Sequence, residues 1–132
     1  MLSLGSAAAL AAGGLLGFAA VVMAAVAAHA LPDTMPPHAA AGVRAAIQMQ
    51  AWHALALVFC ALWIERAQGF ARRLAGLAGT AFGLGALLFC GAVYAHDLAG
   101  VALGPVAPTG GMILMIGWLA IAASAVAARR RP

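Results

Sequence analysis

The chain has 132 residues, of which 66% are apolar and only 8% are charged, with seven arginines and three acidic residues. Soluble domains are about half apolar and about one quarter charged, so this composition excludes a soluble globular protein and a disordered one. The sequence pI of 10.6 does not indicate nucleic-acid binding, because six of the seven arginines form two short clusters beside apolar runs.

Four apolar segments follow one another, each long enough to cross about 30 Å of hydrocarbon as a helix. The first covers about residues 4–30 and the second about residues 45–64. The third covers about residues 74–95 and the fourth about residues 111–128. The predicted fold is therefore all-α: one domain over residues 1–132 that forms an integral membrane bundle of four transmembrane helices.

The arginines predict the orientation of this bundle. Arg66, Arg72 and Arg73 lie between the second and third segments, and residues 129–131 are three further arginines. The connection over residues 97–110 contains no lysine or arginine. Since positive residues accumulate on the cytoplasmic side of a membrane, both termini are predicted to lie inside the cell.

Prolines and glycines mark the two outer connections. Residues 33–37 include two prolines, and a helix is expected to restart near His38 or Ala39, at the membrane interface. In the second connection, Gly104 with Pro105, Pro108 and the glycines at residues 110–111 are predicted to form turns before the fourth segment.

Gln50 and His53 are the most informative polar residues, because they share one helix face near the middle of the membrane. This placement is typical of a proton carrier, of a quinone or haem contact, or of a metal ligand. It is equally typical of interhelical hydrogen bonding, where each bond contributes about 0.6 kcal/mol on average. The sequence leaves both interpretations open.

The other histidines permit a metal site without specifying one. His29 and His96 are predicted at the outer ends of the first and third segments, with His38 in the outer loop. Methionines lie near them, and imidazole with thioether suits copper. The chain contains no H-x₃-H or C-x₂-C pair, so the presence of a metal stays undecided and no cofactor is predicted.

Two further features concern packing. Gly13 and Gly17 are four residues apart, as are Gly79 and Gly83, a spacing that lets helix backbones approach closely, either inside the bundle or between two copies. We expect the packing inside one bundle. The two cysteines are predicted at different depths, about 15 Å apart in height, which is too far for a disulfide.

Four stretches of the sequence are similar to motifs of one small membrane-protein family, domain of unknown function 423, which includes vertebrate transmembrane protein 256. The stretches lie at residues 27–31, 49–55, 89–94 and 108–118, and they resemble the family patterns GAHAL, YQxxHAL, FSGSLY and TPxGG…GW. The sequence departs at Met49, where the family has tyrosine, and at Cys90 and Ala92, where it has serine. A hydroxyl network proposed for the family would therefore be partly absent.

The resemblance implies a small multi-spanning protein of the bacterial inner (plasma) membrane, and it supplies no activity. It directs attention to five candidate binding residues: His29, Gln50, His53, Tyr94 and Pro108. The sequence shows no nucleophile with a base, no phosphate-binding loop and no paired carboxylates. We therefore expect no enzyme and no nucleic-acid partner.

Three functions remain open. The first is a non-enzymatic accessory or assembly protein that acts by helix packing, with the lipid bilayer and other membrane proteins as partners. The second is a carrier or channel for a small solute, proton or metal that uses Gln50 and His53. The third is a redox subunit linked to a quinone or another cofactor, held at His29 or His53. The oligomeric state is not predicted.

Overall fold

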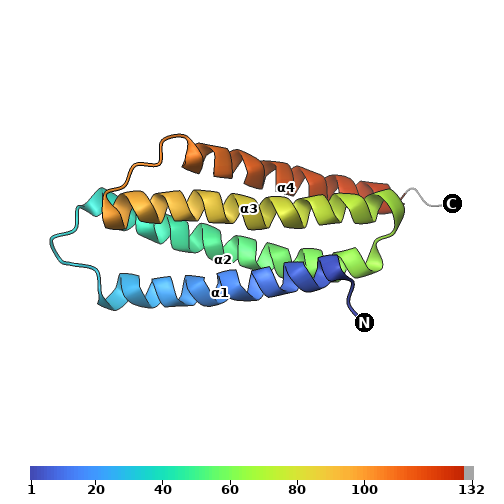
Figure 1. The fold of residues 1–132 in the computed structure, drawn as a ribbon, viewed down its shortest axis with the longest axis horizontal. Coiled ribbons are helices and arrows are strands. Elements are labelled where there is room, and N and C mark those ends of the chain that lie inside the picture. Colours follow the sequence, from blue (N-terminus) through green and yellow to red (C-terminus); the bar gives the residue numbers. More distant parts are fainter. Residues whose placement is uncertain (130–132) are drawn as a thin grey trace.

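The computed structural model describes residues 1–129, which form four helices joined by short connections (Figure 1). These are α1 (Leu4–His29), α2 (Pro37–Arg66), α3 (Gly69–Ala99) and α4 (Val106–Arg129). Each helix is long and apolar enough to cross a membrane. The predicted all-α bundle of four membrane-spanning helices is therefore confirmed.

Three of the four helices, α2, α3 and α4, begin and end beyond the limits of their apolar segments, whereas α1 matches the predicted segment. α2 begins at Pro37, eight residues before its apolar segment and close to the predicted restart near His38, because a proline in the first helical turn has no need of the N–H that it lacks. α3 continues to Ala99 and ends where Gly100 takes a left-handed conformation, with φ at 68°. The hydropathy pattern marks the part of a helix that suits the membrane, whereas the helices themselves continue into the polar connections.

The prediction of turns before the fourth helix is confirmed at Gly104 and Pro105 and is wrong at Pro108 and at residues 110–111. These residues lie in the first turns of α4, which begins at Val106. Pro108 is the third helical residue, a position where the backbone N–H has no partner inside the helix. The turn precedes it: Gly104 has a φ of 55°, and the N–H of Thr109 already donates to the carbonyl of Pro105 at 3.0 Å.

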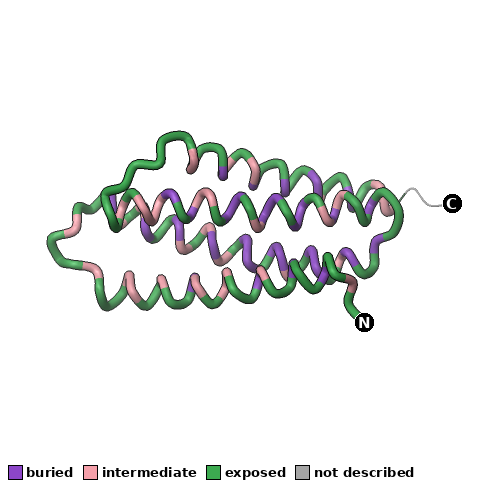
Figure 2. The backbone as a smooth tube through the Cα atoms, in the orientation of Figure 1, coloured by how far each residue is buried: buried purple, intermediate pink, exposed green. Residues whose placement is uncertain are grey.

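α2 and α3 form the centre of the molecule, with α1 and α4 on opposite sides of them (Figure 1). Figure 2 shows that buried residues concentrate on α2 and α3, whereas most of α1 is exposed. In a membrane these exposed apolar faces would contact lipid. α1 begins and α4 ends at the same end of the bundle, where α2 also connects to α3 (Figure 1). Residues 130 and 131, two of the arginines used for the orientation, lie outside the described residues.

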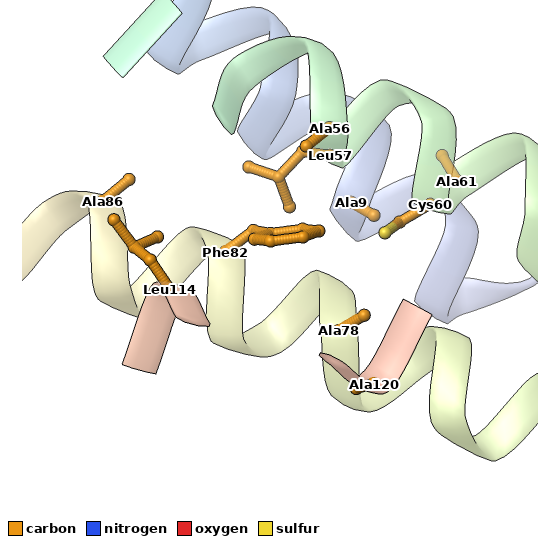
Figure 3. Packing of buried hydrophobic residues seen from close by; sticks show 10 residues of the cluster. All are labelled: Ala9, Ala56, Leu57, Cys60, Ala61, Ala78, Phe82, Ala86, Leu114 and Ala120. Atoms are coloured by element: carbon orange, nitrogen blue, oxygen red, sulfur yellow. The ribbon is translucent and has the colours of Figure 1, made fainter. Parts of the chain in front are cut away.

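The apolar core consists of three large side chains, those of Phe82, Leu57 and Leu114, surrounded by small ones (Figure 3). Phe82 of α3 and Leu57 of α2 are each 1% exposed. Around them lie alanines and one cysteine from α1, α2, α3 and α4, together with Leu114 of α4. Alanine brings the helix axes close together, so a few large side chains suffice to fill the space between them.

The glycine pairs identified in the sequence pack inside the bundle, as expected. A Cβ atom on Gly13 of α1 would lie 2.9 Å from the carbonyl oxygen of Ala54 in α2. A Cβ atom on Gly79 of α3 would lie 3.6 Å from the Cβ of Cys60 in α2. These glycines therefore set the distances between α1, α2 and α3.

The closest approach between helix backbones occurs between α3 and α4, at glycines that the spacing did not single out. A Cβ atom on Gly110 would lie 2.5 Å from the backbone nitrogen of Phe89. One on Gly117 would lie 2.7 Å from the ring of Phe82. Any larger residue at Gly110 would therefore push α4 away from the α3 backbone.

Both cysteines are buried and free, in agreement with the prediction. The thiol of Cys90 donates to the carbonyl oxygen of Ala46 at 3.4 Å, whereas Cys60 packs beside Gly79. The two side chains thus lie at different levels of the bundle.

Candidate functional site

Gln50 lies midway along α2, where its side chain is 4% exposed and bonds to two other helices. Its Nε2 donates to the carbonyl oxygen of Leu16 in α1 at 3.0 Å. Its Oε1 accepts from the hydroxyl of Tyr94 in α3 at 2.9 Å. A single amide therefore links α1, α2 and α3.

His53 lies one helical turn further along α2 and is 3% exposed. Its Nδ1 lies 2.7 Å from the carbonyl oxygen of Met49, and its Nε2 lies 3.2 Å from the indole Nε1 of Trp118 in α4. A carbonyl oxygen only accepts and an indole N–H only donates. Nδ1 must therefore carry the proton while Nε2 accepts, which fixes the ring as the neutral Nδ1–H tautomer.

Aromatic rings surround His53. Its ring centroid lies 5.5 Å from that of Phe82 and 6.0 Å from that of Trp118. The rings of Phe82 and Trp118 contact each other edge to face at 4.9 Å. The imidazole thus completes a group of three rings, one each from α2, α3 and α4.

Gln50, His53, Tyr94 and Trp118 form what we call the polar cluster. With the carbonyl of Leu16, it connects all four helices. Throughout residues 1–129, every buried side-chain nitrogen and oxygen has a hydrogen-bond partner. The buried polar atoms of the cluster therefore already have hydrogen-bond partners within the protein.

Two of the five predicted site residues lie outside this cluster. His29 is the last residue of α1 and is exposed, and Pro108 is exposed in the first turn of α4. Conversely, Trp118 belongs to one of the family motifs but was not predicted as a site residue. Its indole N–H, one of the few side-chain donors in α4, was the available indication, because a donor within a membrane helix requires an acceptor.

A second set of hydrogen bonds joins three helices at the end where α2 meets α3. The indole Nε1 of Trp63 in α2 donates to the hydroxyl of Ser124 in α4 at 2.8 Å. That hydroxyl donates in turn to the carbonyl oxygen of Ala71 in α3 at 2.7 Å. Ser124 is completely buried, and this bond was not predicted from the sequence.

The other histidines do not gather into a metal centre. Among residues 1–129, no three His, Cys, Asp or Glu side chains are close enough to hold a metal ion. His96 instead pairs with Asp97, at 2.8 Å between Nδ1 and Oδ1. The Asp97 carboxylate lies over Gly42 of α2. A metal ion bound to His53 would have to replace the hydrogen bond of one ring nitrogen, either that of Nδ1 to Met49 or that of Nε2 to Trp118.

Four apolar helices tied together by internal hydrogen bonds define a small, multi-spanning helical membrane protein. The model of a family described as protein of unknown function (DUF423) matches residues 23–111. A relative named UPF0382 membrane protein, from Haemophilus influenzae, is 32% identical over 109 residues, which cover 82% of this chain and 85% of the relative. The chain therefore belongs to the DUF423 family. No solved structure matches it.

Proposed function

We propose that the protein is a non-enzymatic accessory or assembly protein of the bacterial inner membrane, which acts by helix packing with both termini inside the cell. One observation supports this proposal most strongly. The buried polar side chains of Gln50, His53 and Ser124 bond to other side chains and to backbone carbonyls across the four helices. Such bonds stabilise a membrane bundle without serving a ligand.

The same hydrogen bonds argue against a carrier that uses Gln50 and His53. A solute or proton would need access to these atoms, yet both side chains are at least 96% buried and already bonded. The groove between α1 and α2 is lined by glycines and apolar side chains, and neither Gln50 nor His53 is among them. Apolar surface of this kind suits lipid or another helix.

The exposed faces supply the surface for a partner helix. α1 packs mainly on α2 and leaves large side chains exposed, among them Leu15, Phe18 and Val21, each about 70% exposed. An exposed apolar side chain on a membrane helix contacts either lipid or a neighbouring protein. The outward face of α1 is therefore the place to search for a partner.

A photo-crosslinking amino acid placed at Phe18 tests the proposal in cells, with the buried Leu57 position as the matched control. The proposal expects one discrete crosslinked membrane protein from position 18 and none from position 57. Proteoliposomes with the wild-type chain and a Gln50→Leu/His53→Leu variant test the carrier alternative with proton-sensitive and metal-sensitive dyes. A flux that requires the wild-type chain and disappears in the variant would overturn the proposal.

A further inference from the structure

Arginines gather at one end of the bundle, the end formed by the last turn of α2, the first turn of α3 and the last turn of α4 (Figure 1). We call this the arginine end. Within residues 1–129, the arginines at this end are Arg66, Arg72, Arg73 and Arg129, and all four are exposed. The end therefore presents several positive charges at the membrane boundary.

The carboxylate at this end, that of Glu65, accepts hydrogen bonds from the start of α1. Oε1 of Glu65 accepts from the backbone nitrogen of Ser3 at 2.9 Å and from the hydroxyl of Ser6. In residues 1–129 the ion pair that the structure contains is between His96 and Asp97, at the opposite end. The arginine charges thus lack an ion-pair partner within the described residues.

An apolar groove leads to this end between α2 and α4, with a volume of about 370 Å³. One wall is formed by Phe59 and Trp63 of α2, whose rings stack 6.4 Å apart with 8° between their planes. The other wall is α4, where Ala122 and Ala125 leave room beside Ile121. Because the Trp63 indole N–H bonds to the protein, the groove offers only flat apolar surface.

Each wall of the groove continues into an arginine. Arg66 follows Phe59 by seven residues and Trp63 by three, so it lies on the same face of α2. Arg129 follows Ala122 by seven residues and Ala125 by four, so it lies on the same face of α4. Two guanidinium groups are thereby placed where the groove reaches the membrane boundary.

We propose that the α2–α4 groove binds a phospholipid with an anionic headgroup, with an acyl chain along the groove and the phosphate between Arg66 and Arg129. Guanidinium groups bind phosphate through paired hydrogen bonds, and a basic pocket between membrane helices is a suitable site for an anionic headgroup. A zwitterionic lipid brings its own cation, which repels the second arginine. The groove therefore selects phosphatidylglycerol over phosphatidylethanolamine.

Native mass spectrometry of the detergent-purified chain tests this, with phosphatidylglycerol and phosphatidylethanolamine of identical acyl chains. In Arg66→Gln/Arg129→Gln, phosphatidylglycerol binding should weaken by about tenfold. The matched control, Arg72→Gln/Arg73→Gln, removes equal charge from the same end on α3, and its binding should stay within about twofold of wild type. Equal weakening in both variants, or equal binding of both lipids to the wild-type chain, would overturn the site.

A second pair of variants tests the groove without changing any charge. Ala122→Leu fills the groove, whereas Ala123→Leu adds the same volume at an exposed position that does not line it. We expect weaker phosphatidylglycerol binding only in Ala122→Leu, with both variants retaining the wild-type melting temperature. Unchanged binding in a folded Ala122→Leu protein would show that the acyl chain lies elsewhere.

Discussion

Replacing Gly110 with alanine tests the packing of α4 on α3. The new Cβ would lie 2.5 Å from the backbone nitrogen of Phe89 and 2.9 Å from the carbonyl oxygen of Gly85. Because these are backbone atoms, no side-chain rotation relieves the contact. Ordinary contact begins at 3.4 Å, so α4 must withdraw by about 0.9 Å, which loosens packing along the interface. We expect a loss of about 3 kcal/mol in the free energy of unfolding, at the upper end for overpacked cores.

The adjacent glycine supplies the control. A Cβ on Gly111 would lie 3.7 Å from the ring of Phe89, an ordinary distance, while the change in helix propensity is the same. Melting in detergent, followed with a maleimide dye that reports exposure of the buried cysteines, should show a fall of about 10 °C for Gly110→Ala. Gly111→Ala should melt at or above the wild-type temperature. Equal melting temperatures for the two variants would show that the contact of Gly110 with the α3 backbone does not limit the packing of α4.

Three further predictions follow from individual contacts. Tyr94→Phe removes the donor to Gln50 and should cost about 1 kcal/mol of unfolding free energy. This loss should vanish in a Gln50→Leu background, and additive losses would show that the two side chains are not coupled. Ser124→Ala leaves the Trp63 indole N–H without its acceptor and should lower the free energy of unfolding by about 1–2 kcal/mol. Ser124→Thr keeps the hydroxyl and should lower it by less, so identical melting temperatures of the two variants would contradict the hydrogen bond. Both cysteines are buried, so maleimide should label neither of them in the folded protein and both of them after denaturation in SDS. Labelling of either cysteine in the folded protein would contradict the packing.

The four helices were predictable because their apolar runs are separated by prolines and arginines, which a membrane helix excludes from its centre. The bounds of α1 and the start of α2 were predictable as well, but the other ends were not, because hydropathy reports where a helix suits lipid and not where its hydrogen bonding stops. Pro37 begins α2 and Gly100 ends α3 through backbone conformation. Pro108, predicted in a turn, was compatible with a first helical turn for the same reason.

Part of the candidate site was also predictable. The three-residue spacing put Gln50 and His53 on one face, and the family resemblance added Tyr94, which bonds to Gln50. The partner of His53 was not predictable, because an apolar helix shows little preference for which face it turns inward. The position of Trp118 therefore depends on how α4 packs against α3, which the glycines at their contact determine.

The side chains of the polar cluster satisfy their hydrogen-bonding groups within the protein, with the His53 ring held between Met49 and Trp118. Nitrogen NMR of the ¹⁵N-histidine-labelled protein in micelles tests it most directly, with the His53 signals assigned from a His53→Gln variant. The structure predicts one neutral imidazole with the proton on Nδ1, and Trp118→Phe should shift the Nε2 signal while Nδ1 stays protonated. A proton on Nε2, or a mixture of tautomers like that of histidine in water, would contradict the account and reopen His53 as a binding site.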